Sequence, residues 1–326
     1  MSGESIQALV EASDFRALLN AIDRFVDAGD WDAIVTLRDR CNEAVERGKQ
    51  VWGVSQFAEY RLALDAPADY AGSVVKEGAG RYALGPLWEV AASKHTWAEL
   101  DPHLSDVRLR AFAAHERAIR GDAVAGADID HQVVDVPLEL EAWEPPYPVA
   151  AYRSDRASFP ERDLPEMEWV DLGDPATPVT NDDAAEALLD LARSWIDDSS
   201  GRGEARAVVG EARDAIRAFG PKRVRMVEVE LADAMAVMAW VGASGGAQGK
   251  RRGTPVGRAG AWWALACVLG LNEEWPVDPD ELGSEGAGLR WFVWDPGDRV
   301  GGWNFYLAVE DPMDGLAWAV SVVDWK

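Results

Sequence analysis

The sequence contains few of the residues that carry metal sites, disulfides and thiol chemistry. Its 326 residues include two cysteines and four histidines. Cys41 and Cys267 lie far apart, each in an apolar helical pattern, which predicts two buried free thiols rather than a disulfide. The histidines are His95, His103, His115 and His131. Because no two have the i, i+4 spacing of a helical zinc site, we expect no metal site and no cofactor.

Basic residues and long apolar runs are also scarce. The 57 acidic residues exceed the 32 basic ones and give a formal net charge of −25. This charge disfavours phosphate backbones and anionic membrane surfaces, and it favours cationic partners. The most apolar run, residues 259–271, is too short to cross a bilayer, and the N-terminus lacks the basic and apolar regions of a signal peptide. We expect a cytoplasmic protein that binds neither nucleic acid nor membrane.

Several catalytic signatures are missing. There is no Gly-x-Ser-x-Gly elbow and no dinucleotide fingerprint after a predicted strand. Asp278, Asp280 and Glu281 crowd one segment, but they lack the spacing of a calcium loop. These absences leave an enzyme open and make a non-catalytic role the first expectation.

Residues 1–126 are predicted to form an all-helical domain. Apolar residues recur at helical spacing over residues 14–28, 31–47 and 51–64, and shorter helices are predicted at 70–75, 86–93 and 106–119. Asp14 is placed to cap the first of these helices, either Ser105 or Asp106 to cap the last, and Gly29 to end the first. Helices joined by short turns predict a solenoid-like domain or an irregular bundle, although no convincing internal repeat supports the solenoid.

Residues 127–180 differ in composition and predict a proline-rich crossover arm. Imperfect alternation over residues 133–140 indicates a strand or an extended segment. Prolines follow at positions 145, 146, 148, 160, 165, 175 and 178, a density that blocks helices and most strand pairing. The arm also carries Trp143, Tyr147, Tyr152, Phe159 and Trp169. These aromatic side chains favour an arm packed on a domain surface over a flexible tether.

Residues 181–326 predict an α+β domain. Helices are expected over 181–195, 203–219, 224–241 and 254–270, with a strand at 224–229 as the alternative start of the third. Three strands follow at 289–295, 303–310 and 316–325, with turns at 295–298 and 311–315. They predict a short antiparallel β-meander with helix 254–270 covering one face. The fold class is therefore mainly α, with an N-terminal helical domain followed by this α+β domain.

Tryptophan is abundant, with 16 residues in the chain and eight of them in its last 65. Each can bury a large apolar surface or stack on a flat ligand. Core packing of the α+β domain is expected to account for most of them. Trp291, Trp294 and Trp303 lie on predicted strands and are candidates for an exposed aromatic platform that stacks on a ligand or a peptide.

A glycine-rich basic loop, residues 242–253, precedes the helix at 254–270. Ser244 in place of the first glycine, and Arg251 after Lys250, argue against a nucleotide P-loop. A looser anion site remains possible at Lys250, Arg251, Arg252 and Arg258, near a helix N-terminus. Such a site could hold a phosphate, a carboxylate or the protein's own acidic groups. The alternative is a loop without a ligand, which is either mobile and solvated or paired internally with acidic groups.

Three hypotheses about function follow. The first is a non-catalytic interaction or scaffold protein that meets a protein partner through its acidic surface. The alternative is a protein that binds an anionic small molecule, or an enzyme that acts on one, at the basic loop 242–258. A nucleic-acid mimic would need carboxylates spaced like phosphates, which the sequence does not reveal.

Overall fold

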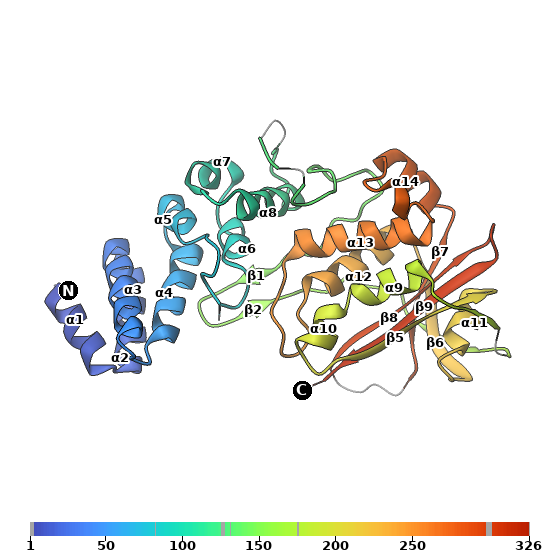
Figure 1. The fold of residues 1–326 in the computed structure, drawn as a ribbon, viewed down its shortest axis with the longest axis horizontal. Helices are drawn as coiled ribbons and strands as arrows, with labels where there is room; N and C mark the ends of the chain where they lie inside the picture. Colours follow the sequence, from blue (N-terminus) through green and yellow to red (C-terminus); the bar gives the residue numbers. More distant parts are fainter. Residues whose placement is uncertain are drawn as a thin grey trace. The chain divides into compact units, whose positions relative to one another are not determined.

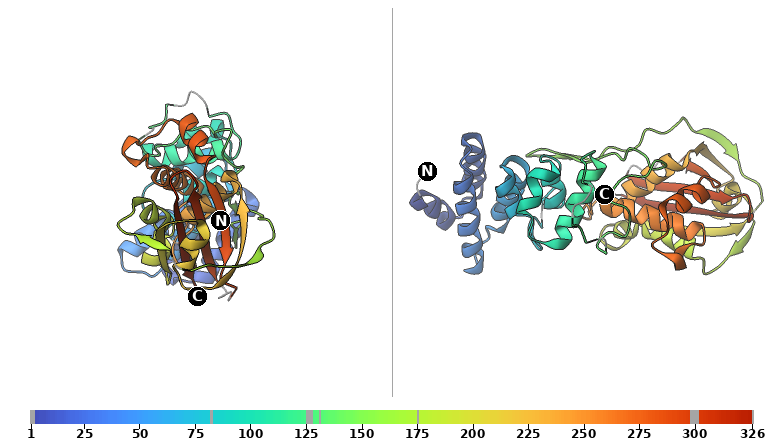
Figure 2. Two further views of the ribbon diagram at one scale, coloured as in Figure 1. Left: turned by 90° about the vertical axis from the view of Figure 1, so that its right-hand side faces the viewer. Right: turned by 90° about the horizontal axis from the view of Figure 1, so that it is seen from above.

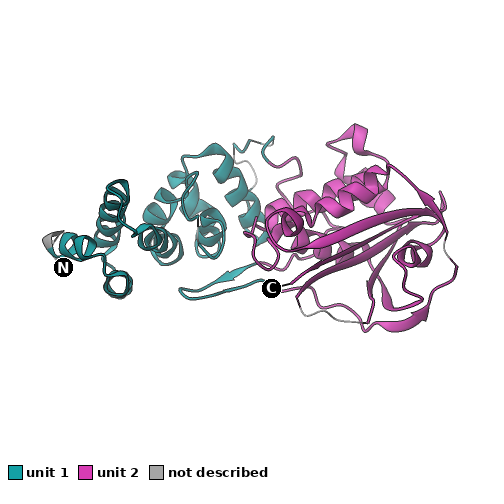
Figure 3. Cartoon of the chain, turned by 60° about the horizontal axis from the view of Figure 1, so that its bottom comes forward, with its two compact units in different colours: residues 1–133, 150–159 teal, residues 134–149, 160–326 magenta. Residues whose placement is uncertain are grey.

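The computed structural model describes residues 3–81, 83–124, 128–130, 132–174, 176–297 and 302–325. The chain divides into two compact units (Figure 3). Unit 1 comprises residues 1–133 and 150–159, and unit 2 comprises residues 134–149 and 160–326. The segment expected to form one arm, 127–180, thus contributes to both units. His131, Pro175 and Asp298, on which the sequence predictions touched, lie outside the described residues.

Unit 1 is a succession of helices that follow one another along the unit (Figures 1 and 2). They are α1 (Gly3–Ala12), α2 (Phe15–Ala28), α3 (Trp31–Glu46), α4 (Trp52–Asp65), α5 (Ala68–Ser73), α6 (Leu87–Ala92), α7 (Trp97–Leu100), η1 (Asp101–His103) and α8 (Val107–Ile119). The predicted helical character of this region is confirmed.

Local sequence signals explain where these helices begin and end. The Asp14 carboxylate accepts a hydrogen bond from the backbone N–H of Ala17 at 3.0 Å, and Asp106 caps α8 in the same way. Gly29 ends α2 with φ of +65°, a conformation that glycine adopts without strain. Leu18 and Ile22 of α2 are four residues apart and fully buried, so one face of that helix enters the core.

Unit 1 also contains a short β-hairpin from the predicted arm. It pairs β1 (Ala151–Tyr152) antiparallel with β2 (Ala157–Ser158). The Tyr152 hydroxyl donates to the buried carboxylate of Glu89 on α6. The Arg120 guanidinium donates to the carbonyl of Ala150 at 2.7 Å. The helices of unit 1 therefore hold the hairpin through buried polar contacts.

Unit 2 is built on a seven-stranded antiparallel sheet in the order β3-β6-β7-β8-β9-β5-β4 (Figure 1). The strands are β3 (Glu168–Asp171), β4 (Thr177–Val179), β5 (Arg202–Val209), β6 (Arg223–Val229), β7 (Arg290–Asp295), β8 (Trp303–Asp311) and β9 (Leu316–Asp324). The helices are α9 (Asp183–Asp190), α10 (Arg193–Asp197), α11 (Ala212–Arg217), α12 (Leu231–Ala243), α13 (Thr254–Val268), η2 (Asn272–Glu274) and α14 (Pro279–Gly286). Strands β7 to β9 match the predicted ones, but the sheet is larger than the short meander that was expected.

The additional strands come from segments whose sequence favours other structures. Residues 203–219 were predicted as one helix, which is wrong, because they contain most of β5 and then α11. Alanines and arginines dominate Arg202–Val209 and suit a helix, but all eight residues pair with β9. The alternative strand at 224–229 is confirmed as β6. Strands β3 and β4 form the two edges of the sheet, and the proline in β4 suits an edge position.

Helices cover both faces of the sheet in unit 2 (Figure 1). Helix α11 packs on one face against Phe292, Trp294 and Ala308. Helices α9 and α12 contact the other face, and α13, the helix predicted to cover the sheet, packs against α9 and α12. The Trp318 indole of β9 donates to Asp182, the N-cap of α9, at 2.8 Å. Within the described residues, no helix is long and apolar enough to cross a membrane.

Helices α12 and α13 approach closely at a glycine. A Cβ atom added at Gly257 would lie 1.9 Å from the carbonyl oxygen of Ala239 and 2.7 Å from the nitrogen of Ala243. Both neighbours are backbone atoms of α12, so the helices would have to separate. At Gly260, also on α13, the nearest atom would be the flexible Leu191 side chain at 3.2 Å.

We predict that Gly257→Ala lowers the free energy of unfolding by roughly 1–3 kcal/mol because it overpacks this contact. Gly260→Ala should be neutral or stabilising because alanine favours a helix over glycine by about 1 kcal/mol. Urea denaturation followed by tryptophan fluorescence measures both. Equal effects of the two substitutions would contradict the close helix contact.

Candidate functional site

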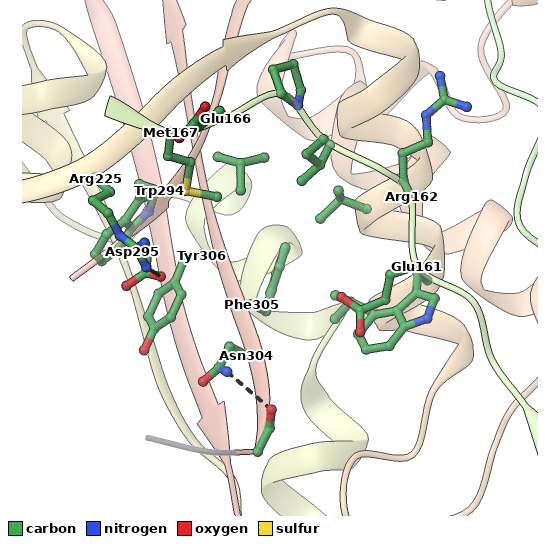
Figure 4. Close-up of a pocket in the computed structure, with 17 residues that line it drawn as sticks. Glu161, Arg162, Glu166, Met167, Arg225, Trp294, Asp295, Asn304, Phe305 and Tyr306 are labelled. Atoms are coloured by element: carbon green, nitrogen blue, oxygen red, sulfur yellow. Dashed lines mark hydrogen bonds and ion pairs between the residues drawn. The ribbon is translucent and has the colours of Figure 1, made fainter. Parts of the chain in front are cut away.

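A pocket of about 680 Å³ opens within unit 2 (Figure 4). One wall is an extended segment, residues 161–167, which we call the strap. The other walls are α12 and the strands β6, β7 and β8. The volume falls in the range of about 300–1,000 Å³ that is typical of small-molecule sites.

The pocket opens where neighbouring strands diverge. The register of β7 with β8 runs from Arg290 and Glu310 to Val293 and Leu307. Beyond that point β7 stays paired with β6 as far as Asp295, while β8 stays paired with β9. The ends of β7 and β8 are therefore not hydrogen-bonded to each other, and their side chains line the pocket.

The strap is attached to α12 by an ion pair. Nε of Arg162 donates to Oδ1 of Asp233 at 2.7 Å, and both side chains are at least two-thirds buried. Leu164 and Met167 of the strap line the pocket. Pro165 restricts the backbone and keeps the segment extended. The strap thus forms a fixed wall along the pocket.

The lining side chains are partly aromatic. Trp240 comes from α12, Trp294 from β7, and Phe305 and Tyr306 from β8. Trp294 and Tyr306 pack with ring centroids 4.7 Å apart, and Trp240 stacks on Trp303 at 5.0 Å. Burial, together with the nearby Asp295 charge, raises the pKa of Tyr306, so its hydroxyl stays protonated at neutral pH.

Charged residues also line the pocket. Arg225 of β6 pairs with Asp295 of β7, which also accepts the backbone N–H of Gly297 at 2.6 Å. Glu161 and Glu166 lie on the strap and are exposed. Figure 4 shows Glu161 and Glu166 toward opposite ends of the strap, with Trp294 and Tyr306 on the strands to one side and Phe305 nearer the middle.

The predicted aromatic platform is not on the surface. Trp291 is 1% exposed and Trp294 is 2% exposed, because each faces helices that cover its side of the sheet. Trp303 is half-buried and packs between Trp195 and Trp240. Of the three candidates, only Trp294 lines the pocket. Core packing therefore accounts for this part of the tryptophan cluster.

A carboxylate of the chain itself fills the centre of the glycine-rich basic loop. Asp324 on β9 is fully buried and accepts the backbone N–H of Ala247 at 2.6 Å and that of Ser200 at 3.2 Å. Further loop N–H groups donate to the hydroxyls of Ser199 and Ser244. The sequence allowed a phosphate, a carboxylate or an acidic group of the protein at this loop. In the structure, the Asp324 carboxylate of the protein itself accepts the loop's hydrogen bond.

The four basic residues proposed for an anion site do not converge. Lys250 and Arg252 are exposed, while Arg251 donates to the Thr254 hydroxyl at 3.1 Å. Arg258 is fully buried on α13. The prediction that Arg258 shares an anion site with the other three residues is wrong. Its guanidinium is buried and already donates to acceptors of the protein, so it cannot reach a ligand.

Arg258 is instead the centre of a buried polar network. Its guanidinium donates to both oxygens of Glu144, at 2.7 and 2.6 Å, and to the carbonyls of Pro137 and Glu139. The Trp262 indole and the Tyr147 hydroxyl also donate to Glu144. Burial opposes ionisation of Glu144, but the hydrogen bonds and charge of Arg258 outweigh it and lower the pKa of this carboxyl. The network fixes residues 134–149 against α13.

The described residues contain no group of three or more metal-ligating side chains that could hold a metal ion. Cys41 and Cys267 are free and buried, as predicted. Burial raises the pKa of each thiol to about 12, so neither is a reactive thiolate at neutral pH.

Sequence reasoning did not identify the pocket residues as a site. Arg162 and Asp233 are 71 residues apart, and Arg225 and Asp295 are 70 apart. No motif links these positions. The sequence did indicate that the proline-rich arm, with its aromatic and charged residues, packs on a domain surface. It did not indicate which helices or strands the arm contacts.

We predict that Glu144→Gln and Arg258→Met each lower the free energy of unfolding by roughly 3–5 kcal/mol, because each leaves a buried partner unmatched. The double variant should lose much less than the sum, since it leaves no isolated charge. Chemical denaturation of all four proteins completes the cycle. Additive losses would contradict the coupling.

The same variants test the acid dependence. The pKa of Glu144 is lower in the folded state than its ordinary value of 4.5. Its contribution to stability is therefore fully present above that value and is lost as the pH falls through the lower, folded-state pKa. Glu144→Gln should flatten this part of the stability profile below pH 4.5, and an unchanged slope would contradict the assignment.

The sequence was compared with protein families, curated proteins and solved structures. No curated protein and no solved structure matches the chain. The profile of a family of unknown function, DUF6183, matches residues 16–313. This match includes most of both units and every residue that lines the pocket. The chain therefore belongs to the DUF6183 family.

Proposed function

We propose that this protein binds a small molecule in the pocket of unit 2. The observation that carries the proposal is the pocket itself, about 680 Å³ between the strap, α12 and the diverging ends of β7 and β8. It combines aromatic and aliphatic walls with a few charged groups, the composition typical of ligand sites. The ion pair between Arg162 and Asp233 keeps the strap in place beside it.

This proposal differs from a site at the basic loop. The loop N–H groups donate to Asp324 and two serine hydroxyls, and Arg258 is held by Glu144. A ligand there would have to displace protein acceptors that already satisfy these donors. The pocket requires no such displacement.

We further propose binding without covalent chemistry. The lining residues that the structure describes include no serine, threonine, cysteine, histidine or lysine. These side chains are common nucleophiles and bases in covalent catalysis, which also uses the carboxylate and tyrosine types that do line the pocket. A role as a binding or sensing protein accommodates the pocket without requiring them.

Val237 on α12 lines the pocket and is partly buried, so a larger side chain there would enter the pocket. We predict that N-phenyl-1-naphthylamine, a neutral fluorescent aromatic probe, binds the parent protein with one-to-one stoichiometry. Val237→Trp should weaken this binding at least tenfold, while Lys250→Ala with Arg252→Ala should leave it unchanged. Fluorescence titration measures the three affinities.

Circular dichroism and melting temperature establish that Val237→Trp folds. If that variant is unfolded, Val237→Phe replaces it as a smaller obstruction. The proposal is wrong if the folded obstructed variant binds the probe as tightly as the parent, or if the basic-loop variant is the one that loses binding.

A second function, a protein-interaction role, is favoured by two exposed aromatic side chains in unit 1. Phe15, the first residue of α2, is 47% exposed, and Trp52, the first residue of α4, is 43% exposed. The Phe15 ring lies against Gly53, because a Cβ added there would be 3.3 Å from it. Aromatic side chains are enriched at protein interfaces, and Phe15 lies against the residue that follows Trp52.

We predict that a photo-crosslinking benzoylphenylalanine at position 15 gives a discrete crosslinked protein in the native host. Position 107 is the control, because Val107 on α8 is 61% exposed in the same unit. Gel shift and mass spectrometry identify the products. No product at position 15, or the same products at both positions, would contradict a specific interface.

A further inference from the structure

We propose that the pocket of unit 2 takes an organic cation, that is, an alkylated or protonated amine joined to an apolar or aromatic body. This inference rests on the proposed function and adds the chemical class of the ligand. It follows from how the charges around the pocket are paired.

The two arginines of the pocket are already neutralised. Arg225 pairs with Asp295, and Arg162 pairs with Asp233 at 2.7 Å. The positive charge of each guanidinium is therefore balanced by a neighbouring carboxylate. An anion entering here would compete with Asp295 or Asp233 for a positive charge that the carboxylate already balances.

The strap supplies two further carboxylates. Glu161 and Glu166 both line the pocket and are exposed at its rim. In the described part of the chain neither forms an ion pair with a basic side chain. With both arginines matched, these two glutamates leave an excess of negative charge among the described residues that line the pocket. That excess attracts a cation and repels an anion.

Aromatic walls select the kind of cation. Phe305 and Tyr306 of β8 and Trp294 of β7 line the same pocket as the two glutamates. The negative face of an aromatic ring attracts a positive charge, and the gain grows when the cation gives up its water easily. An alkylated ammonium meets this requirement and also fills apolar space beside Met167 and Val237.

One polar side chain adds an acceptor. Nδ2 of Asn304 donates to the carbonyl of Gly302 at 3.2 Å, which leaves Oδ1 of the same amide to accept from a ligand. A protonated amine or a hydroxyl on the ligand would meet this oxygen. The acceptors around the pocket thus match a donor-bearing cation.

The test uses three probes of similar size, namely 3-hydroxyphenyltrimethylammonium, its neutral counterpart 3-tert-butylphenol and the anionic 3-hydroxybenzenesulfonate. Each is titrated against the parent protein by calorimetry and by displacement of N-phenyl-1-naphthylamine. We expect the ammonium compound to bind at least tenfold more tightly than the neutral phenol, and the sulfonate more weakly than either. Added salt should reduce the preference for the cation, since the glutamates are exposed.

The matched variants are Glu161→Gln with Glu166→Gln, and, as control, Glu273→Gln with Glu274→Gln. The control removes the same charge from exposed positions of unit 2 that do not line the pocket. The strap variant should lose about tenfold in affinity for the ammonium compound and less than twofold for the neutral phenol. The control should retain both affinities.

Equal binding of the ammonium compound and the neutral phenol would overturn the inference and leave the proposed function standing. An equal loss of affinity for the ammonium compound in the strap and control variants would also overturn the inference, because the net charge of the protein would then explain the effect. Failure of every probe to bind at millimolar concentration, in both assays, would overturn the inference and the proposed function together.

Discussion

The buried pair of Glu144 and Arg258 is the interaction on which the architecture of unit 2 depends. Both side chains are fully buried, and neither charge can stay there without the other. Glu144 lies in residues 134–149, and Arg258 lies on α13, so the pair fixes that segment across the helix. Trp143 adds to this contact, since its ring packs 4.8 Å from Trp262 and its indole donates to Pro279. The same pair removes Arg258 from any ligand site.

The chain leaves unit 2 after residue 149 and re-enters it at residue 160, and polar contacts hold both the segment 150–159 and the strap that follows it. Within unit 1, Tyr152 is held by Glu89. Within unit 2, Arg162 is held by Asp233, which places the strap beside α12. The pocket exists because the strap is anchored there and because β7 and β8 diverge beyond Val293 and Leu307. The charge balance of the pocket depends on two ion pairs. Arg162 is paired with Asp233, and Arg225 is paired with Asp295.

Local signals in the sequence predict local structure well. Asp14 and Gly29 mark the ends of α2, and turn residues separate β8 from β9, because caps and turns depend on a few adjacent residues. Strand β5 was missed because its pairing with β9 overrides the helical preference of its alanines and arginines. The role of the basic loop was not predictable, since Asp324 lies 77 residues from Ala247. The pocket was missed for the same reason, as its walls come from five separate segments of the chain.

We propose that unit 2 holds an organic cation beside the strap. The most direct measurement is a crystal structure of the full chain grown with 3-hydroxyphenyltrimethylammonium at a concentration that saturates binding in solution. We expect the ligand between residues 161–167 and α12, with its ammonium group near Glu161 or Glu166 and an aromatic face of β8. An empty pocket under those conditions, or the ligand bound at the loop 242–258 instead, would contradict it.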